Sequence, residues 1–180
     1  MSDIIQEALQ ELFVALTTRW RKENGVLAIG VSRKQLLKAG SIESQVLEDL
    51  LKKLKENISS LGLELLEYIY EGEAWYAIRS TYVAPADLKS EEEAVLAVII
   101  AHIESSTENK KEVPVANVKK KLVNGKYFSE YQFERILRNL EQSGYIERKK
   151  NNLLYSPRIL IELPQEARKH ICEESARLIF

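Results

Sequence analysis

Residues 61–81, LGLELLEYIYEGEAWYAIRST, decide the fold, because the chain changes here from a helical period to a strand period. The side chains alternate as in a strand with two different faces. One side carries Leu63, Leu65, Glu67 and Ile69, and the other carries Glu64, Leu66, Tyr68 and Tyr70. Residues 71–73, Glu-Gly-Glu, predict a turn, and 75–78 form the return strand. A lone hairpin is marginally stable in water, so we expect it to pack against the helices that precede it.

Three helices are predicted ahead of this hairpin. Apolar residues recur at three-to-four spacing over 3–22, and Asn24-Gly25 ends this first helix. Ser32 begins a short helix that ends at Gly40. The apolar face of a third helix consists of Val46, Leu47, Leu50, Leu51 and Leu54.

The same order returns in the second half. Ser90 and Glu93 predict a capping box for a helix over 91–106 that is apolar nearly all round and therefore central to a core. A short helix over 115–122 follows, and Ser129 with Gln132 opens a third one, which Gly144 ends. A second hairpin spans 145–155, with its turn at 149–152.

A helix, helix, helix, hairpin unit that occurs twice is a tandem winged helix. The predicted fold class is therefore mainly α with short β-hairpin wings, an α+β fold. The predicted domains are a first winged helix at 1–84, a linker at 85–89, a second winged helix at 90–163 and a C-terminal helix at 164–180 that begins at Pro164.

Composition excludes several classes of protein. With one cysteine, Cys172, and two histidines among 180 residues, the chain has no disulfide framework, and its composition argues against a zinc site. The N-terminus is acidic where a signal peptide is basic, and no apolar run reaches about 18 residues, so we expect an intracellular protein with no membrane partner.

No catalytic motif is present. The sequence lacks a phosphate-binding glycine loop, HExxH, CxxC and GxSxG, so we expect no enzymatic activity, no cofactor and no metal. We interpret His102 as a core histidine with satisfied hydrogen bonds, and Cys172 as a passive, partly buried residue. The acids Glu91, Glu92 and Glu93 complement a helix dipole.

Charge is unevenly distributed, although the formal net charge is -1. Residues 109–158 contain twelve Lys or Arg and five acids, so the second unit is locally basic. A DNA-binding winged helix places its third helix in the major groove and its wing on phosphates, which makes weak, sequence-tolerant binding of double-stranded DNA a hypothesis here. Glu134 and Glu141 interrupt the helix face, and a merely solvated surface is an equal alternative. The candidate DNA-binding residues are Lys119, Lys120, Lys121, Arg135, Arg138, Arg148, Lys149 and Lys150.

Four aromatic residues are candidates for binding a protein partner. Trp20 belongs either to the core or to an interface, and Phe128 either forms a hydrophobic staple with its helix or contacts a partner. Tyr127 and Tyr131 are candidate contacts for a partner helix. The third helix of the first unit carries mixed charge, which suits a protein-docking module better than phosphate.

Three stretches, 61–81, 91–106 and 145–163, resemble the kleisin-interacting tandem winged-helix (KITE) proteins of SMC chromosome complexes. The likeness covers 1–163 and is nearest to the MAGE-homology branch, through Tyr155, Pro157 and Arg158, with bacterial ScpB as the second-nearest branch. The chain departs from the MAGE pattern in the charged loop STENKKE, and it lacks the glycine- and proline-rich ending of the ScpB second wing.

The resemblance implies a non-enzymatic accessory subunit of an SMC–kleisin complex. Such a subunit would bind a kleisin segment, pair with a second winged-helix subunit or a second copy of itself, and be cytoplasmic and nucleoid-associated, or nuclear in a eukaryote. A winged-helix transcriptional regulator that binds specific DNA sites is the alternative. A docking subunit for a RING-type ubiquitin ligase, as in MAGE proteins, is a third hypothesis.

Overall fold

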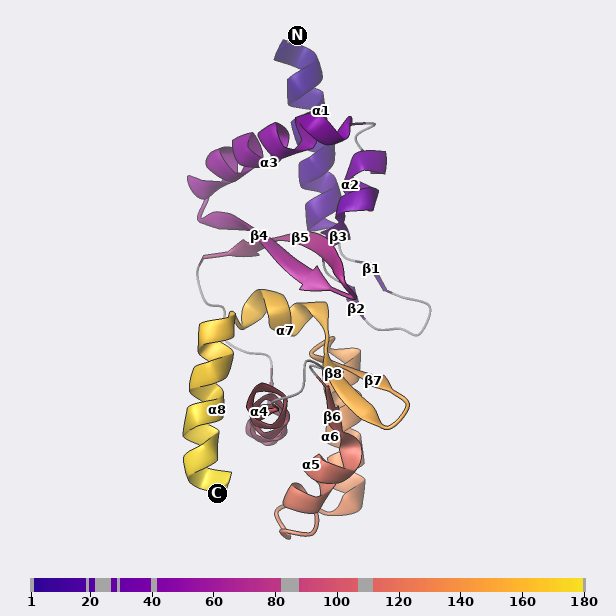
Figure 1. Ribbon diagram of the computed structural model, residues 1–180, viewed down its shortest axis with the longest axis vertical. Helices are drawn as coiled ribbons and strands as arrows, with labels where there is room; N and C mark the ends of the chain where they lie inside the picture. The colour runs from indigo at the N-terminus through magenta and orange to yellow at the C-terminus, as the bar shows by residue number, and fades with distance from the viewer. Residues whose placement is uncertain are drawn as a thin grey trace. The chain divides into compact units, whose positions relative to one another are not determined.

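The computed structural model describes residues 2–18, 20–21, 27–28, 30–39, 42–81, 88–106 and 112–179 (Figure 1). The chain divides into two compact units, one of Met1–Trp20 with Ala28–Pro85 and the other of Arg21–Leu27 with Ala86–Phe180. Each unit combines helices with a three-stranded antiparallel sheet. The predicted α+β winged-helix fold class is confirmed.

The first unit begins with a helix that is shorter than expected. The helix α1 ends at Thr17, and Trp20 lies in the short strand β1, which pairs with β2, so the predicted extension to residue 22 is wrong. Thr17 and Thr18 donate hydroxyl hydrogen bonds to the carbonyls of Phe13 and Val14, and such bonds compete with helix continuation. The elements are α1 (Ser2–Thr17), β1 (Trp20–Arg21), β2 (Leu27–Ala28), β3 (Val31–Ser32), α2 (Arg33–Ala39), α3 (Ser44–Ser59), β4 (Leu63–Tyr70) and β5 (Glu73–Ser80).

The predicted hairpin is the wing of this unit. Strands β4 and β5 pair from Leu63↔Ser80 to Tyr70↔Glu73, and β3 adds a third strand on the other side of β5. The two turn residues, Glu71 and Gly72, have φ of 52° and 80°, as a type I′ turn requires. The strand β3 was not predicted, because two residues are too few to show an alternating pattern.

The helices and the sheet of the first unit share one core. The hairpin packs against the helices through partly buried residues of both strands, as expected for a hairpin that is unstable alone. The buried core residues are Leu12, Leu16, Val31, Leu36, Leu47, Leu50, Leu51, Leu54, Ile58 and Tyr76. Val46 was expected in this core but is exposed.

The second unit repeats the pattern and adds two helices after the wing. The helix α7, which starts with Pro157 at its first position, was not predicted. Its six residues directly follow the last strand. The elements are α4 (Ser90–Ser105), β6 (Glu112–Pro114), α5 (Val115–Leu122), α6 (Glu130–Gln142), β7 (Ile146–Lys149), β8 (Asn152–Tyr155), α7 (Pro157–Glu162) and α8 (Gln165–Ile179), with sheet order β6-β8-β7.

The helix α4 is central to the core of the second unit, as its nearly continuous apolar surface predicts. Its residues Val95, Ile99 and Ile103 are fully buried together with Phe133 and Leu137 of α6. The helix α8 packs against α4 (Figure 1). No helix in the described ranges is long and apolar enough to cross a membrane.

The two predicted capping boxes have different outcomes. At α6 the Ser129 hydroxyl accepts from the Gln132 N–H at 3.3 Å, while Gln132 Oε1 accepts from the Ser129 N–H at 2.9 Å, as predicted. At α4 the predicted pair, Ser90 with Glu93, is wrong by one residue. The observed pair is Lys89 with Glu92, whose carboxylate accepts from the Lys89 N–H at 3.0 Å. Glu92 also accepts from Asn139 Nδ2 at 2.8 Å, and these bonds lower the pKa of its carboxyl group.

A buried polar cluster of Arg168, Glu104 and Tyr155 connects α8 with α4 and β8. Arg168 Nε lies 2.9 Å from Glu104 Oε1, and the side chains are only 11% and 5% exposed. The Tyr155 hydroxyl donates to the same oxygen at 3.0 Å, and the Arg168 guanidinium lies 5.2 Å from the Tyr155 ring centroid. Burial of Tyr155 beside a carboxylate raises its pKa, so the phenol stays protonated and remains a donor.

Candidate nucleic-acid and partner surfaces

The helix α6 occupies the third-helix position that a DNA-binding winged helix uses for recognition. Its apolar residues, Phe133, Ile136, Leu137 and Leu140, are buried, so the opposite side is left to polar groups. Arg135 and Arg138 are exposed there, and the half-buried Glu134 directly precedes Arg135.

Ion pairs engage Lys119, Arg135 and Arg148 among the predicted DNA-binding cations. Arg135 Nη2 lies 3.5 Å from Glu91 Oε2, and Lys119 pairs with Glu130 at the start of α6. Pairing lowers the positive potential that these cations offer to phosphate, so the local charge surplus overstates the basic character of the surface.

Arg148 joins the wing to α6. Its Nη2 lies 3.4 Å from Glu134 Oε2 and its Nε 3.5 Å from Glu141 Oε1, and the side chain is only 29% exposed. Burial raises the pKa of Glu141, and the Arg148 charge opposes this shift. The structure therefore brings Arg148 to α6, where its charge is mostly shielded from solvent.

The remaining candidates lie on three elements. Lys120 on α5, Arg138 on α6 and Lys150 in the wing turn are exposed. Arg138 Nε donates to the Glu134 carbonyl at 3.4 Å, a bond that leaves its charge uncompensated. Lys121 is half-buried, and Lys149 is exposed at the end of β7.

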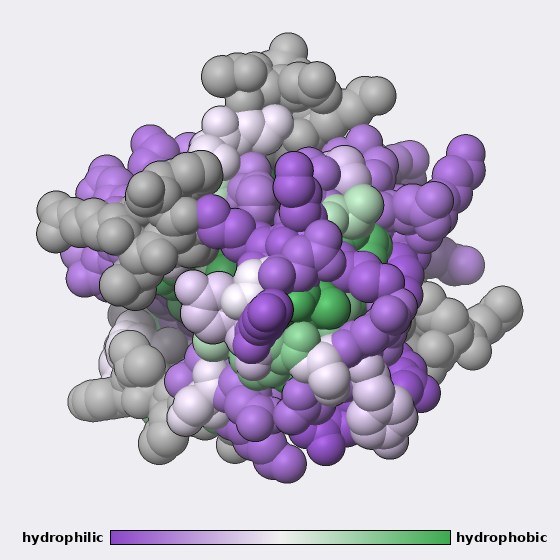
Figure 2. Space-filling model, turned by 90° about the horizontal axis from the view of Figure 1, so that it is seen from below, coloured by the Kyte–Doolittle hydropathy of each residue, from purple (hydrophilic) through white to green (hydrophobic). Residues whose placement is uncertain are grey.

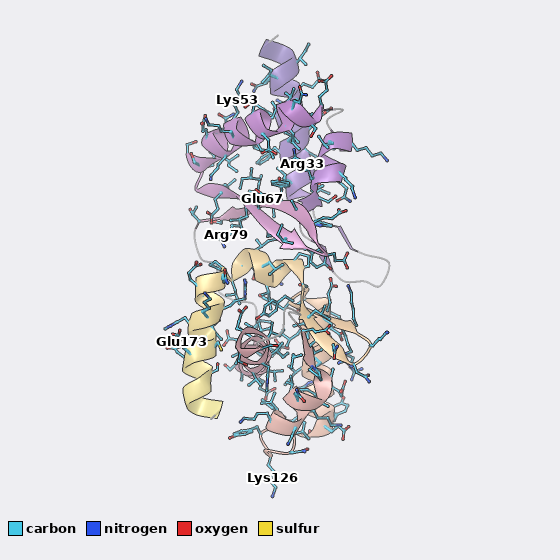
Figure 3. All side chains as sticks on the ribbon, viewed as in Figure 1. Arg33, Lys53, Glu67, Arg79, Lys126 and Glu173 are labelled. Carbon is cyan, nitrogen blue, oxygen red and sulfur yellow. The ribbon has the colours of Figure 1, made fainter. Side chains whose placement is uncertain are left out.

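The connection from α5 to α6 carries an exposed cation, Lys126, which was not predicted to bind DNA. Lys126 is exposed, has φ of 64°, and extends away from this end of the unit (Figure 3). Seen from this end, the surface is mostly hydrophilic, with a small apolar area near its centre (Figure 2).

The aromatic candidates for partner binding differ in how far their side chains are exposed. Tyr127 and Tyr131 are 72% and 73% exposed. Phe128 is partly buried against the core, in keeping with the hydrophobic-staple alternative. The side chain of Trp20 lies outside the described part of the chain.

A second group of exposed apolar residues belongs to the first unit, and sequence periodicity did not predict that they are exposed; it assigned Val46 to the core. Ile4 and Val14 lie on α1 but outside the three-to-four spacing that runs through Ile5, Leu9, Leu12, Phe13 and Leu16, a departure that could have flagged them. Exposed apolar residues of this kind often mark a protein interface. The group consists of Ile4, Ile5, Val14, Val46, Leu61 and Ile69.

His102 differs from its prediction as a satisfied core histidine. Its Nε2 is buried and makes no hydrogen bond to any residue that the structure describes. Burial lowers its pKa, and the positive charge of Lys121 lowers it further. The neutral imidazole is therefore the form that suits this position.

The lone cysteine lies in surroundings that disfavour its thiolate form. Cys172 is partly buried, its Sγ lies 3.6 Å from the Ala101 carbonyl oxygen, and burial raises the pKa of the thiol. Among the described residues no group of three or more His, Cys, Asp or Glu could hold a metal ion.

Comparison with known proteins gives a match of structure. No protein-family model and no curated protein matches the chain. A chain in the solved structure of an Nse1-Nse3-Nse4 complex matches with a TM-score of 0.65 and 13% identity, over 93% of this chain and 75% of that one. The predicted resemblance is confirmed at the level of the fold.

Proposed function

We propose that this protein is a non-enzymatic accessory subunit of an SMC–kleisin complex. It binds a kleisin segment, and its second unit contacts double-stranded DNA weakly. The observation that carries the proposal is the tandem winged-helix fold, matched over nearly the whole chain by a chain from a multi-subunit complex. One fold serves several functions, so the surfaces have to support this one. The proposed location is the cytoplasm, in association with the chromosome.

The first unit supports a protein-docking role. Ile4 and Val14 expose aliphatic side chains on α1, and a partner helix binds through such anchors. The exposed face of α3 carries both signs of charge, which suits a protein better than a polyanion. The partner paired with this subunit is either another winged-helix protein or a second copy.

The second unit supports weak contact with DNA. Lys120, Arg138 and Lys150 are exposed and come from α5, α6 and the wing. Contacts from such side chains go mainly to phosphates, so binding would tolerate any sequence and weaken steeply with salt. The ion pairs of Lys119, Arg135 and Arg148 keep this binding weak.

Affinity capture from lysate of the native organism, at moderate salt, tests the proposal. Kleisin or SMC peptides are expected among the captured proteins, and Ile4→Asp with Val14→Asp should reduce their yield. A matched control is Ser105→Asp with Gln165→Asp, which adds the same two negative charges at exposed positions of the second unit. The proposal fails if neither a kleisin nor an SMC subunit associates with the folded wild-type protein.

A transcriptional regulator is the second candidate, supported by the two exposed arginines of α6. It requires site-specific binding in which Arg135→Ala and Arg138→Ala relax base preference. A footprint at a single promoter would favour it, whereas binding that ignores sequence would exclude it.

A further inference from the structure

The α5–α6 turn presents an unusual pair of aromatic side chains. Among the side chains that the structure describes, Tyr127 and Tyr131 are the only exposed aromatics. Tyr127 lies just before α6, and Tyr131 lies in its first turn. Exposed aromatic rings without a structural role in the core are frequent ligand contacts.

The ring of Tyr127 is held in place from one side. A Cβ atom on Gly125 would lie 2.9 Å from Tyr127 Cε2 and 3.0 Å from Cδ2, so the ring rests on the glycine backbone. Backbone hydrogen bonds from Tyr127 N to the Leu122 carbonyl and from Lys126 N to the Val123 carbonyl order the turn. A flat surface that is already ordered loses little conformational entropy when a ligand stacks on it.

Cations accompany the two rings. Lys126 is adjacent to Tyr127 in the chain, and Arg135 and Arg138 follow Tyr131 by four and seven residues on α6, which places them on the same side of the helix. Arg135 is paired with Glu91. The acids of this region are also engaged, because Glu130 pairs with Lys119 and Glu134 with Arg148.

A partner helix is a poor match for this surface. Helix-in-groove binding needs several apolar anchors, and every exposed large aliphatic side chain identified in the described residues belongs to the first unit. Unpaired nucleotides offer flat base faces together with phosphates, which suit rings flanked by cations. Bases inside a duplex are already stacked on one another and are closed to such rings.

We infer that the Tyr127–Tyr131 surface binds single-stranded nucleic acid, with the rings stacking on bases and with Lys126 and Arg138 near phosphates. The inference rests on, and deepens, the DNA contact in the proposed function. In this assignment, unpaired strands bind at the turn between α5 and α6, residues 123–129, and at the start of α6. Double-stranded DNA binds to the wing and to the rest of α6.

Fluorescence anisotropy with labelled oligothymidine and with a duplex of equal length tests the assignment. Combined Tyr127→Ala and Tyr131→Ala substitutions should weaken oligothymidine binding by at least roughly tenfold, because each stacked base contributes substantially. Duplex affinity should change by less than about twofold, since its phosphate contacts remain. The Tyr127→Phe, Tyr131→Phe protein should bind oligothymidine like wild type, because stacking needs the ring and not the hydroxyl.

Other results would overturn the inference. Unchanged oligothymidine affinity in the alanine protein excludes stacking, and so does an equal loss for both oligonucleotides in a protein with a native circular dichroism spectrum. If oligothymidine binding persists while kleisin capture is lost, the tyrosines contact a protein helix instead. Wild-type protein that binds no oligonucleotide refutes the inference, while capture of a kleisin still tests the proposed function separately.

Discussion

His102 couples stability to pH. The unfolded chain protonates this imidazole near its ordinary pKa of about 6.5, whereas burial and Lys121 lower the pKa in the folded state. Between these two values the unfolded state binds more protons, so the free energy of unfolding rises with pH and falls on acidification.

We therefore expect His102→Gln to reduce the loss of stability between about pH 7.5 and about pH 5.5, because glutamine does not ionise. Urea unfolding at both pH values measures this difference. Equal pH dependence in the His102→Gln protein and the wild type would contradict the prediction.

At the scale of elements, the attachment of α8 depends on one buried ion pair. Removing Arg168 alone leaves the Glu104 carboxylate buried without its guanidinium, and such a loss costs about 3–5 kcal/mol. We expect this destabilisation for Arg168→Met, and a smaller one when Glu104→Leu is added, because no buried charge then remains. Chemical unfolding of both single variants and the double variant gives the coupling energy. Additive effects would show that the pair is not coupled.

The ion pairs between Arg148 of the wing and the acids Glu134 and Glu141 of α6 give a second prediction for these elements. Glu134→Gln removes an acid that pairs with Arg148, so we expect duplex DNA to bind roughly threefold more tightly, with a salt slope steeper by about 0.9. Anisotropy titrations across salt concentrations measure both quantities. Glu166→Gln on α8 makes the same change of charge away from α6 and should have no effect. A weaker or unchanged affinity in the Glu134→Gln protein would mean that Arg148 does not reach DNA.

The long elements could be predicted because apolar periodicity extends over several turns or over both strands of a hairpin. The strands β3 and β6 and the helix α7 are too short for such a pattern. The start of α4 was misplaced because Glu92 also binds Asn139, a residue 47 positions away. The cations of the candidate site were visible in the sequence, but their neutralisation was not, since Arg135 meets Glu91 only through the fold.

For the whole molecule, position matters more than net charge. The chain has a formal charge of -1, so DNA binding has to come from a local surface. Lys149→Glu with Lys150→Glu changes the second wing, and Lys52→Glu with Lys53→Glu changes α3 of the first unit by the same charge. We expect the wing pair to weaken duplex binding by roughly tenfold or more and the α3 pair to change it by less than about twofold. Similar losses, measured by anisotropy, would indicate that total charge governs binding.

The partial burial of Cys172 has a practical consequence for experiments on this protein. A thiolate is the form that reacts with maleimides, and the raised pKa of Cys172 keeps its sulfur protonated. A cysteine introduced in place of the exposed Tyr131 should therefore be labelled well before the native one. A photocrosslinker attached at this position could identify the molecule that lies against α6 in a native extract. The wild-type chain, treated in the same way, measures the background labelling of Cys172.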